Sequence, residues 1–131
     1  MKTEYLVLGG ERIPATDGKT FAVIEPALGK PFAEVAEAGT EDVERAVQGA
    51  YRAFEEGKWP RLSATERGRI LLQAATLVRK HLEEIATVEA RNAGKPIRDA
   101  RGEVALAANV LEYWGGAANK IFGETSSLDS A

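Results

Sequence analysis

The chain has 131 residues, of which 44% are hydrophobic and 28% are charged, and its formal net charge at pH 7 is −3. These values predict one globular unit with a hydrophobic core, and they argue against nucleic acid or an anionic membrane as a partner. Charged residues interrupt every apolar run before the ~18 residues of a membrane-spanning helix. Residues 1–14 lack the apolar segment of a secretion signal, which predicts a cytoplasmic location. Because the sequence contains no cysteine, it offers no disulfide, thiolate metal ligand or cysteine nucleophile.

Short segments rich in β-branched and aromatic residues alternate with turn residues over residues 1–38. Gly9-Gly10 separates two of them, and a glycine pair favours a tight hairpin turn. Asp17-Gly18 marks a second turn, and Pro26, Gly29 and Pro31 mark a loop. The predicted strands are residues 5–8, 12–13, 20–24 and 32–36. Isolated hairpins are only marginally stable, so this β-hairpin region needs a helix or a further sheet to pack on.

Residues 40–57 predict the first of three helices. Thr40 is a suitable N-cap, and the acidic residues that follow complement the positive end of the helix dipole. Apolar residues recur at helical spacing and Gly57 ends the pattern. The residues of this apolar pattern are Val43, Ala46, Val47, Ala50 and Phe54.

Two longer helices are predicted over residues 63–92 and 96–122, separated by a hinge. Ser63 and Glu66 form a capping box, the clearest start signal in the sequence. Gly94 can adopt the left-handed conformation that ends a helix, and Pro96 suits the first turn of the next. Residues 123–131 have the composition of a linker.

The third predicted helix carries two adjacent apolar rows that together cover about half of its circumference. One row is Ala100, Val104, Ala107, Leu111, Trp114, Ala118 and Ile121, and the other is Leu106, Val110, Tyr113 and Ala117. A helix with a single interface needs a stripe of only ~100°. If four to six of these side chains stayed uncovered, each would lose ~1.5–3 kcal/mol of burial free energy. The sum is comparable with the whole ~5–15 kcal/mol stability of a domain. We therefore expect one incomplete α+β domain over residues 1–131, mostly helical, whose missing partner is more polypeptide or another copy.

The order of these segments resembles the N-terminal part of the aldehyde dehydrogenase superfamily, over essentially the whole chain. Each motif alone is weak, whereas their joint order and spacing is specific. The motifs are Leu8-Gly9-Gly10-Glu11, Glu25-Pro26-Ala27-Leu28-Gly29, Glu41-Asp42-Val43-Glu44-Arg45-Ala46-Val47 with Ala50 and Ala53-Phe54, Trp59, Glu66-Arg67 with Ile70-Leu71, Gly94-Lys95-Pro96-Ile97 and Tyr113-Trp114-Gly115-Gly116-Ala117.

The resemblance implies the fold of the N-terminal part of an aldehyde dehydrogenase cofactor-binding domain and a parent enzyme that oxidises aldehydes to acids with NAD or NADP. In such enzymes a cysteine thiolate attacks the carbonyl, and an asparagine and a backbone N–H stabilise the oxyanion. The residues that match the family here include neither the catalytic nor the dinucleotide-binding groups. No Gly-x-Gly-x-x-Gly follows a predicted strand either. We therefore expect this chain alone to bind no cofactor and to be inactive.

Two lesser sites follow from the resemblance by position. Residues matching Leu106, Ala107 and Val110 line the mouth of the substrate tunnel in relatives, although packing core is the simpler interpretation. Some relatives hold a structural monovalent cation near the residue matching Ile24 and an acidic residue at the position of Asn92. An amide carbonyl can still coordinate a cation, but it brings no charge. A polar residue at a helix end is the simpler interpretation of Asn92.

Other candidate groups favour structural roles. His81, the only histidine, lies at the edge of the second helix's apolar stripe. We expect neither an acid nor a nucleophile beside it, and therefore a boundary residue and not a base. Gly94-Lys95 is not a phosphate loop, because Pro96 occupies its Ser/Thr position. The Tyr113-Trp114 pair is expected in the core. The alternative to an enzyme segment is a non-catalytic helical interaction module that binds itself or a partner through the third helix.

Overall fold

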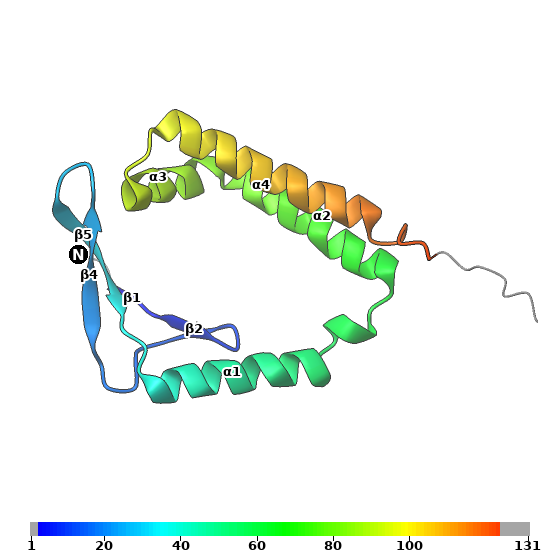
Figure 1. Cartoon of the computed structure of the whole chain (residues 1–131), viewed down its shortest axis with the longest axis horizontal. Coiled ribbons are helices and arrows are strands. Elements are labelled where there is room, and N and C mark those ends of the chain that lie inside the picture. Colours follow the sequence, from blue (N-terminus) through cyan, green and yellow to red (C-terminus); the bar gives the residue numbers. More distant parts are fainter. Residues whose placement is uncertain (1–2, 124–131) are drawn as a thin grey trace, which may run out of the picture.

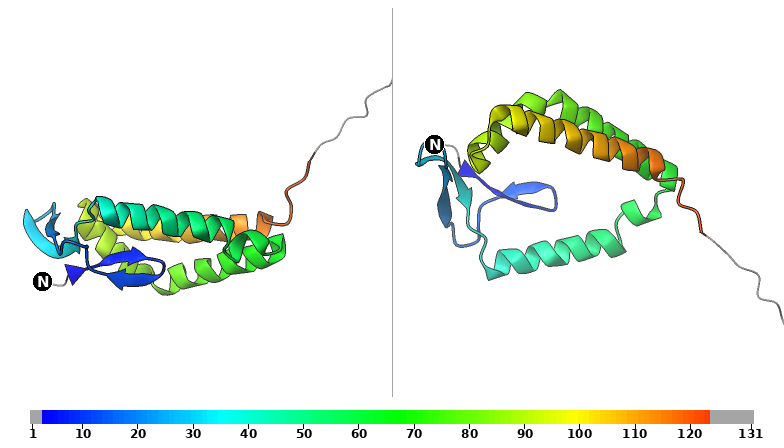
Figure 2. Two further views of the ribbon diagram at one scale, coloured as in Figure 1. Left: turned by 90° about the horizontal axis from the view of Figure 1, so that it is seen from below. Right: turned by 45° about the horizontal axis from the view of Figure 1, so that its top comes forward.

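The computed structural model describes residues 3–123 as an open frame of strands and helices (Figure 1). The strands are β1 (Thr3–Glu4), β2 (Leu6–Leu8), β3 (Glu11–Ile13), β4 (Thr20–Glu25) and β5 (Lys30–Ala36). The helices are α1 (Thr40–Glu55), the 3-10 turn η1 (Trp59–Arg61), α2 (Ala64–Lys80), α3 (Leu82–Ala93) and α4 (Ile97–Ala117). The sheet of β4 and β5 stands at one end. Helix α1 runs along one side and α2, α3 and α4 lie together along the other (Figures 1 and 2).

The predicted hairpin at Gly9-Gly10 is confirmed. Strands β2 and β3 pair antiparallel with Leu6 opposite Ile13. Gly9 and Gly10 have φ of 62° and 89°, a conformation that glycine adopts without steric cost. The turn thus needs both glycines.

The remaining strands form a three-stranded sheet in the order β1-β5-β4. Strands β4 and β5 pair antiparallel through the turn around Gly29, whose N–H donates to the carbonyl of Glu25 at 2.8 Å. Strand β1 pairs parallel with β5, with Thr3 opposite Glu34. The sequence analysis did not include β1, because a two-residue strand carries no periodicity.

Helix α1 begins where the acidic residues predict, but its cap differs from the prediction. The N-cap is Gly39 rather than Thr40, and Asp42 at the third helical position accepts a bond from the Gly39 N–H at 3.1 Å. The side chain of Asp42 therefore supplies the cap that Thr40 was expected to give. The helix ends at Glu55, two residues before Gly57.

The prediction of one continuous helix over residues 63–92 is wrong. The Ser63–Glu66 capping box that starts it is confirmed, with Ser63 Oγ accepting from the Glu66 N–H at 3.2 Å. At His81 (φ −102°, ψ 19°) the axis changes direction and α3 begins. Because the His81 N–H still bonds Leu77 and its carbonyl still accepts from Ile85, both at 3.0 Å, the bend interrupts few hydrogen bonds. No glycine or proline marks it in the sequence.

The hinge after α3 follows the prediction at Gly94, which has φ 69° and donates to the carbonyl of Ala90 at 2.9 Å. Pro96 is the N-cap of α4 rather than a residue of its first turn. The helix ends at Ala117, five residues short of the predicted end, just after the glycine pair 115–116. Of the linker-like residues 123–131, all but Gly123 lie outside the described residues.

The buried face of α4 is not the one that the apolar rows predict. Ala100 and Val104 are buried as expected, but Ala108 and Gly115, which belong to neither apolar row, are buried too. The backbone of Gly115 lies close to that of Gly68 on α2, and Ala86 of α3 packs with Ala100 and Val104. Gly68 and Ala75 of α2 are buried as well. A seam of small residues lets the helix backbones approach closely, so the large apolar side chains of α4 point elsewhere.

Candidate functional site

Helix α4 exposes its large apolar side chains. Four of them are about half or more exposed: Leu106 60%, Val110 47%, Tyr113 68% and Trp114 59%. Ala107 is also exposed. Tyr113 and Trp114 contact each other edge to face with ring centroids 5.2 Å apart. The prediction that this pair belongs to the core is wrong for the described residues, while the expectation that residues 3–95 cannot cover both rows is confirmed. We call Leu106, Ala107, Val110, Tyr113 and Trp114 the α4 face.

Ion pairs link α4 to α2 and α3. Arg101 makes a bidentate pair with Glu83, with Nη2 2.8 Å and Nε 3.0 Å from its carboxylate oxygens. Lys95 Nζ lies 2.7 Å from Glu89 and 2.5 Å from Glu103. These hydrogen bonds, first to Glu103 and then to Glu89, raise the pKa of Lys95, so it stays protonated in neutral solution.

Arg79 of α2 adds a third link, donating to Asn109 at 3.0 Å and pairing with Glu112. Exposed ion pairs are individually weak. Together with the small-residue seam, however, they set the rotation of α4 and hence the direction of the α4 face.

The two residues proposed for a cation site lie at neighbouring element ends. Ile24 precedes the end of β4, where Glu25 accepts from Arg91 of α3 at 2.8 Å. Arg91 also lies over the Phe32 ring, 4.6 Å from its centroid. One residue after Arg91, Asn92 is exposed near the end of α3. The Glu25–Arg91 pair thus holds the segments that carry Ile24 and Asn92 next to each other. The group that Arg91 adds beside them is a guanidinium and not a further carboxylate.

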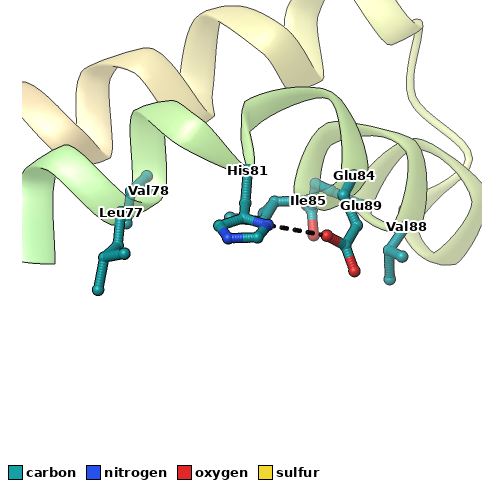
Figure 3. A pocket seen from close by; sticks show the side chains of 7 residues that line it. All are labelled: Leu77, Val78, His81, Glu84, Ile85, Val88 and Glu89. Carbon is teal, nitrogen blue, oxygen red and sulfur yellow. Dashed lines mark hydrogen bonds and ion pairs between the residues drawn. The ribbon is translucent and has the colours of Figure 1, made fainter.

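The bend between α2 and α3 lines an open apolar hollow with a volume of about 560 Å³ (Figure 3). His81 stands at its centre, and its Nδ1 lies 3.0 Å from Glu84 Oε2. The hollow is lined by Leu77, Val78, His81, Glu84, Ile85, Val88 and Glu89. His81 lies at the helix bend and is partly exposed, as expected of a boundary residue, but the expectation that no acid lies beside it is wrong, because Glu84 is its partner. No hydroxyl or thiol lines the hollow, so the arrangement favours docking over nucleophilic catalysis.

Helix α1 presents a further uncovered surface, which we call the α1 row. Its members recur at spacings of four, four and three residues, so they lie along one face of the helix. They are Val43, Val47, Tyr51 and Phe54, with exposed fractions of 53%, 59%, 66% and 73%. A neighbouring face of α1 carries Ala46, Gly49, Ala50 and Ala53, which line a hollow together with Val7, Leu8 and Gly9 of the β2–β3 hairpin.

Asp42 joins the start of α1 to the loop between β3 and β4, a role that was not predicted from the sequence. Its carboxylate is 1% exposed and accepts from the Thr16 hydroxyl at 2.6 Å and from the Thr16 and Gly39 N–H groups at 3.2 and 3.1 Å. The Thr16 hydroxyl, followed by these backbone donors, lowers the pKa of Asp42. A sequence signal existed, since an acid at the third position of a helix is half of a capping box. The contact with Thr16, 26 positions away, left no trace in the sequence pattern.

Several surfaces of the described residues are left uncovered by the rest of the chain. Across residues 3–123 no group of three or more His, Asp or Glu side chains is placed to hold a metal ion. The helices in the same range are all too short or too polar to cross a lipid bilayer. The features that stand out are the α4 face, the α1 row and the α2–α3 hollow.

Comparison with known proteins gives these surfaces a context. Residues 13–131 match the model of the aldehyde dehydrogenase family. The chain is 42% identical to aldehyde dehydrogenase family 2 member B4, mitochondrial, of Arabidopsis thaliana, over 95% of this chain and 23% of the relative. It is 38% identical to betaine aldehyde dehydrogenase of Bacillus subtilis, over 95% of this chain and 26% of the relative.

A solved structure, the NAD-dependent aldehyde dehydrogenase from Sinorhizobium meliloti, superposes with a TM-score of 0.87 at 34% identity. That match covers 93% of this chain and 24% of the other. The chain therefore spans about a quarter of the length of the proteins that it resembles.

Proposed function

Because the chain belongs to the aldehyde dehydrogenase family, we propose that it is the N-terminal part of an NAD(P)-dependent enzyme that oxidises an aldehyde to a carboxylic acid. The observation that carries this proposal is the match of nearly the whole chain to about a quarter of each relative. Large apolar side chains left exposed on α1 and α4 agree with it, since the remaining three quarters of such an enzyme would supply their cover.

In this proposal the described residues perform positioning and not chemistry. The chain has no cysteine, so the thiolate that attacks the aldehyde must come from the remainder, as must the dinucleotide contacts. Leu106, Ala107 and Val110 on the α4 face would form part of the wall of the substrate tunnel. All three side chains are exposed, which leaves them free to contact a substrate that the remainder binds. The ion pairs from Arg101 and Lys95 would keep this wall in place.

A cation site at Ile24 and Asn92 is the weaker part of the proposal. Ile24 can offer a backbone carbonyl and Asn92 an amide carbonyl, both of which suit a monovalent cation only with additional ligands from the remainder. If they contribute, Asn92→Ala in the complete enzyme should raise the K⁺ concentration needed for half-maximal stabilisation against heat. An unchanged K⁺ dependence would remove Asn92 from the site.

The experiment that tests the main proposal compares this chain with its in-frame continuation. We expect no aldehyde-dependent NADH or NADPH formation by purified residues 1–131, followed by absorbance at 340 nm. A polypeptide extended by the downstream coding sequence should be active. Turnover by residues 1–131 that copurifies with the chain through two different affinity tags would overturn the assignment of a purely positioning role.

A second candidate is an interaction module that associates with another copy through the α4 face. The exposure of Tyr113 and Trp114 favours it, because large exposed aromatic side chains are characteristic of interface centres. Sedimentation velocity of the chain alone distinguishes the two. A concentration-dependent dimer abolished by Trp114→Ser, together with no activity from the extended polypeptide, would support the module over the enzyme segment.

A further inference from the structure

The chain exposes far more surface than a compact protein of its size. Its accessible area is 10085 Å² for 14.1 kDa, whereas a compact monomer of that mass exposes about 6,700 Å². Ten residues lie outside the described range and can account for at most about 1,600 Å² of the total. Residues 3–123, about 13 kDa, would expose about 6,300 Å² as a compact monomer, so an excess of at least about 2,100 Å² belongs to them. With a similar area on the partner, the total falls within the ~2,000–5,000 Å² of obligate interfaces.

The excess exposed area is divided among separate faces of the molecule. This argues against a second copy of the chain as the partner that covers them. A two-fold dimer is formed through one self-complementary patch. The α1 row contains two aromatic and two valine side chains, which together offer at most about 500 Å². That is less than the ~800 Å² per partner of a standard interface. One larger body that contacts α1 and α4 together would cover what a second copy cannot.

Helix α1 depends on such a body more than the other helices do. Helix α4 is held on α2 and α3 by the small-residue seam and by the ion pairs of Arg101, Lys95 and Arg79. Helix α1 is fastened at its start by Asp42, packs beside the β2–β3 hairpin, and lies apart from α2 and α4 in both Figure 1 and the right view of Figure 2. Its α1 row is therefore exposed on a helix with little support of its own.

We propose that residues 1–131, supplied as a separate polypeptide, assemble in trans with the C-terminal remainder of an aldehyde dehydrogenase, and that the α1 row is a required docking surface. This inference rests on the proposed function. It goes further, because it states that no covalent link between the two parts is needed and names the helix face that holds them together. The seam, the caps and the ion pairs already fix α2, α3 and α4 within this chain, so it can present preformed faces to the remainder.

The test uses the Bacillus subtilis relative without its first quarter as the remainder, co-expressed with tagged residues 1–131. We expect a stoichiometric complex in sedimentation and aldehyde-dependent NADH formation that neither part shows alone. Val47→Glu places a charge in the α1 row and should weaken the complex by at least about tenfold, the equivalent of ~1.4 kcal/mol. Because Val47 is 59% exposed, the helicity of the chain alone should not change, and far-UV circular dichroism checks this.

Gln48→Glu is the matched control. It adds the same charge to the next residue of the same helix, outside the α1 row. It also replaces the 2.8 Å hydrogen bond from Gln48 to Glu44 with two like charges four residues apart, which costs only ~0.2–0.5 kcal/mol, so it should assemble like the wild-type chain. If Val47→Glu assembled as tightly as Gln48→Glu, the α1 row would not be a docking surface and the inference would be overturned.

A covalent fusion of the two parts separates this inference from the proposed function. An active fusion with no assembly in trans would overturn the inference and leave the enzyme assignment standing. An inactive fusion would count against the enzyme assignment itself, and the inference would fail with it. Self-association of residues 1–131 that excludes the remainder would favour a second copy as the occupant and overturn the inference.

Discussion

The close backbone approach of α2 and α4 at Gly68 and Gly115 gives the sharpest prediction for folding. A Cβ built on Gly68 of α2 would lie 2.5 Å from the carbonyl oxygen of Gly115 on α4 and 3.4 Å from the Ala118 Cβ. The first contact is with backbone, so no side-chain rotation relieves it and the two helices must separate. We therefore expect Gly68→Ala to open the seam that also holds Ala108 and Ala75.

The magnitude follows from two opposing effects. Overpacking a close contact costs ~1–3 kcal/mol, and the rigid obstacle puts Gly68→Ala in the upper part of that range. Alanine gains ~0.8–1 kcal/mol over glycine inside a helix. The net expectation is a loss of about 1–2 kcal/mol in the free energy of unfolding. Gly102→Ala in α4 is the matched control, because its added Cβ would meet nothing within 4 Å. It should gain about 0.5–1 kcal/mol.

Urea unfolding followed by circular dichroism at 222 nm measures both variants at one protein concentration. The midpoint should fall for Gly68→Ala and rise for Gly102→Ala, with similar slopes. A midpoint for Gly68→Ala at or above that of Gly102→Ala would refute the close approach of α2 and α4.

Three further predictions concern charge and exposure. Asp42→Asn should lower the thermal midpoint, since the amide cannot accept all the bonds from Thr16 and Gly39. The pKa of Asp42 is lower in the folded chain than the ordinary aspartate value of ~3.9, so its ionisation stabilises the fold fully above pH ~3.9. The wild-type chain should therefore lose this stabilisation as pH falls below ~3.9 and through the folded-state pKa. Melts from pH 7 to pH 3 should show a shallower acid dependence for Asp42→Asn, and equal slopes would contradict the role of this carboxylate. Arg101→Gln should destabilise the chain less than Gly68→Ala does. Because Arg101 and Glu83 are exposed, added NaCl should reduce the difference in unfolding free energy between Arg101→Gln and the wild-type chain. Urea midpoints at low and high salt test this, and a difference that persists in high salt would mean that the pair is shielded from solvent. Because Trp114 is 59% exposed, acrylamide should readily quench its fluorescence in the chain alone and much less in the assembled enzyme. The Trp59→Phe variant isolates the Trp114 signal. Equal quenching in both states would show that the α4 face stays uncovered.

Local chemistry in the sequence determined the elements whose signals lie within a few residues of one another. Gly9-Gly10 predicted the hairpin turn, Ser63 and Glu66 the start of α2, and Gly94 the end of α3, because positive φ and capping are properties of single residues and their near neighbours. The order of motifs also indicated the family, and the excess of apolar residues on the third helix predicted that part of this helix would be left uncovered.

Tertiary contacts decided what those local signals could not. The parallel pairing of β1 with β5 joins segments some thirty residues apart, and Asp42 became a buried fastener only because Thr16 folds back on it. The bend at His81 carries no helix-breaking residue, and beyond it α3 buries Ala86 in one cluster with Ala100 and Val104. The same packing chose the face of α4. Hydrophobic periodicity shows which face of a helix is apolar, but it does not show whether small residues that allow close backbone contact or large apolar side chains will be buried. Only the structure therefore shows that Ala108 and Gly115 are buried and that Tyr113 and Trp114 are exposed.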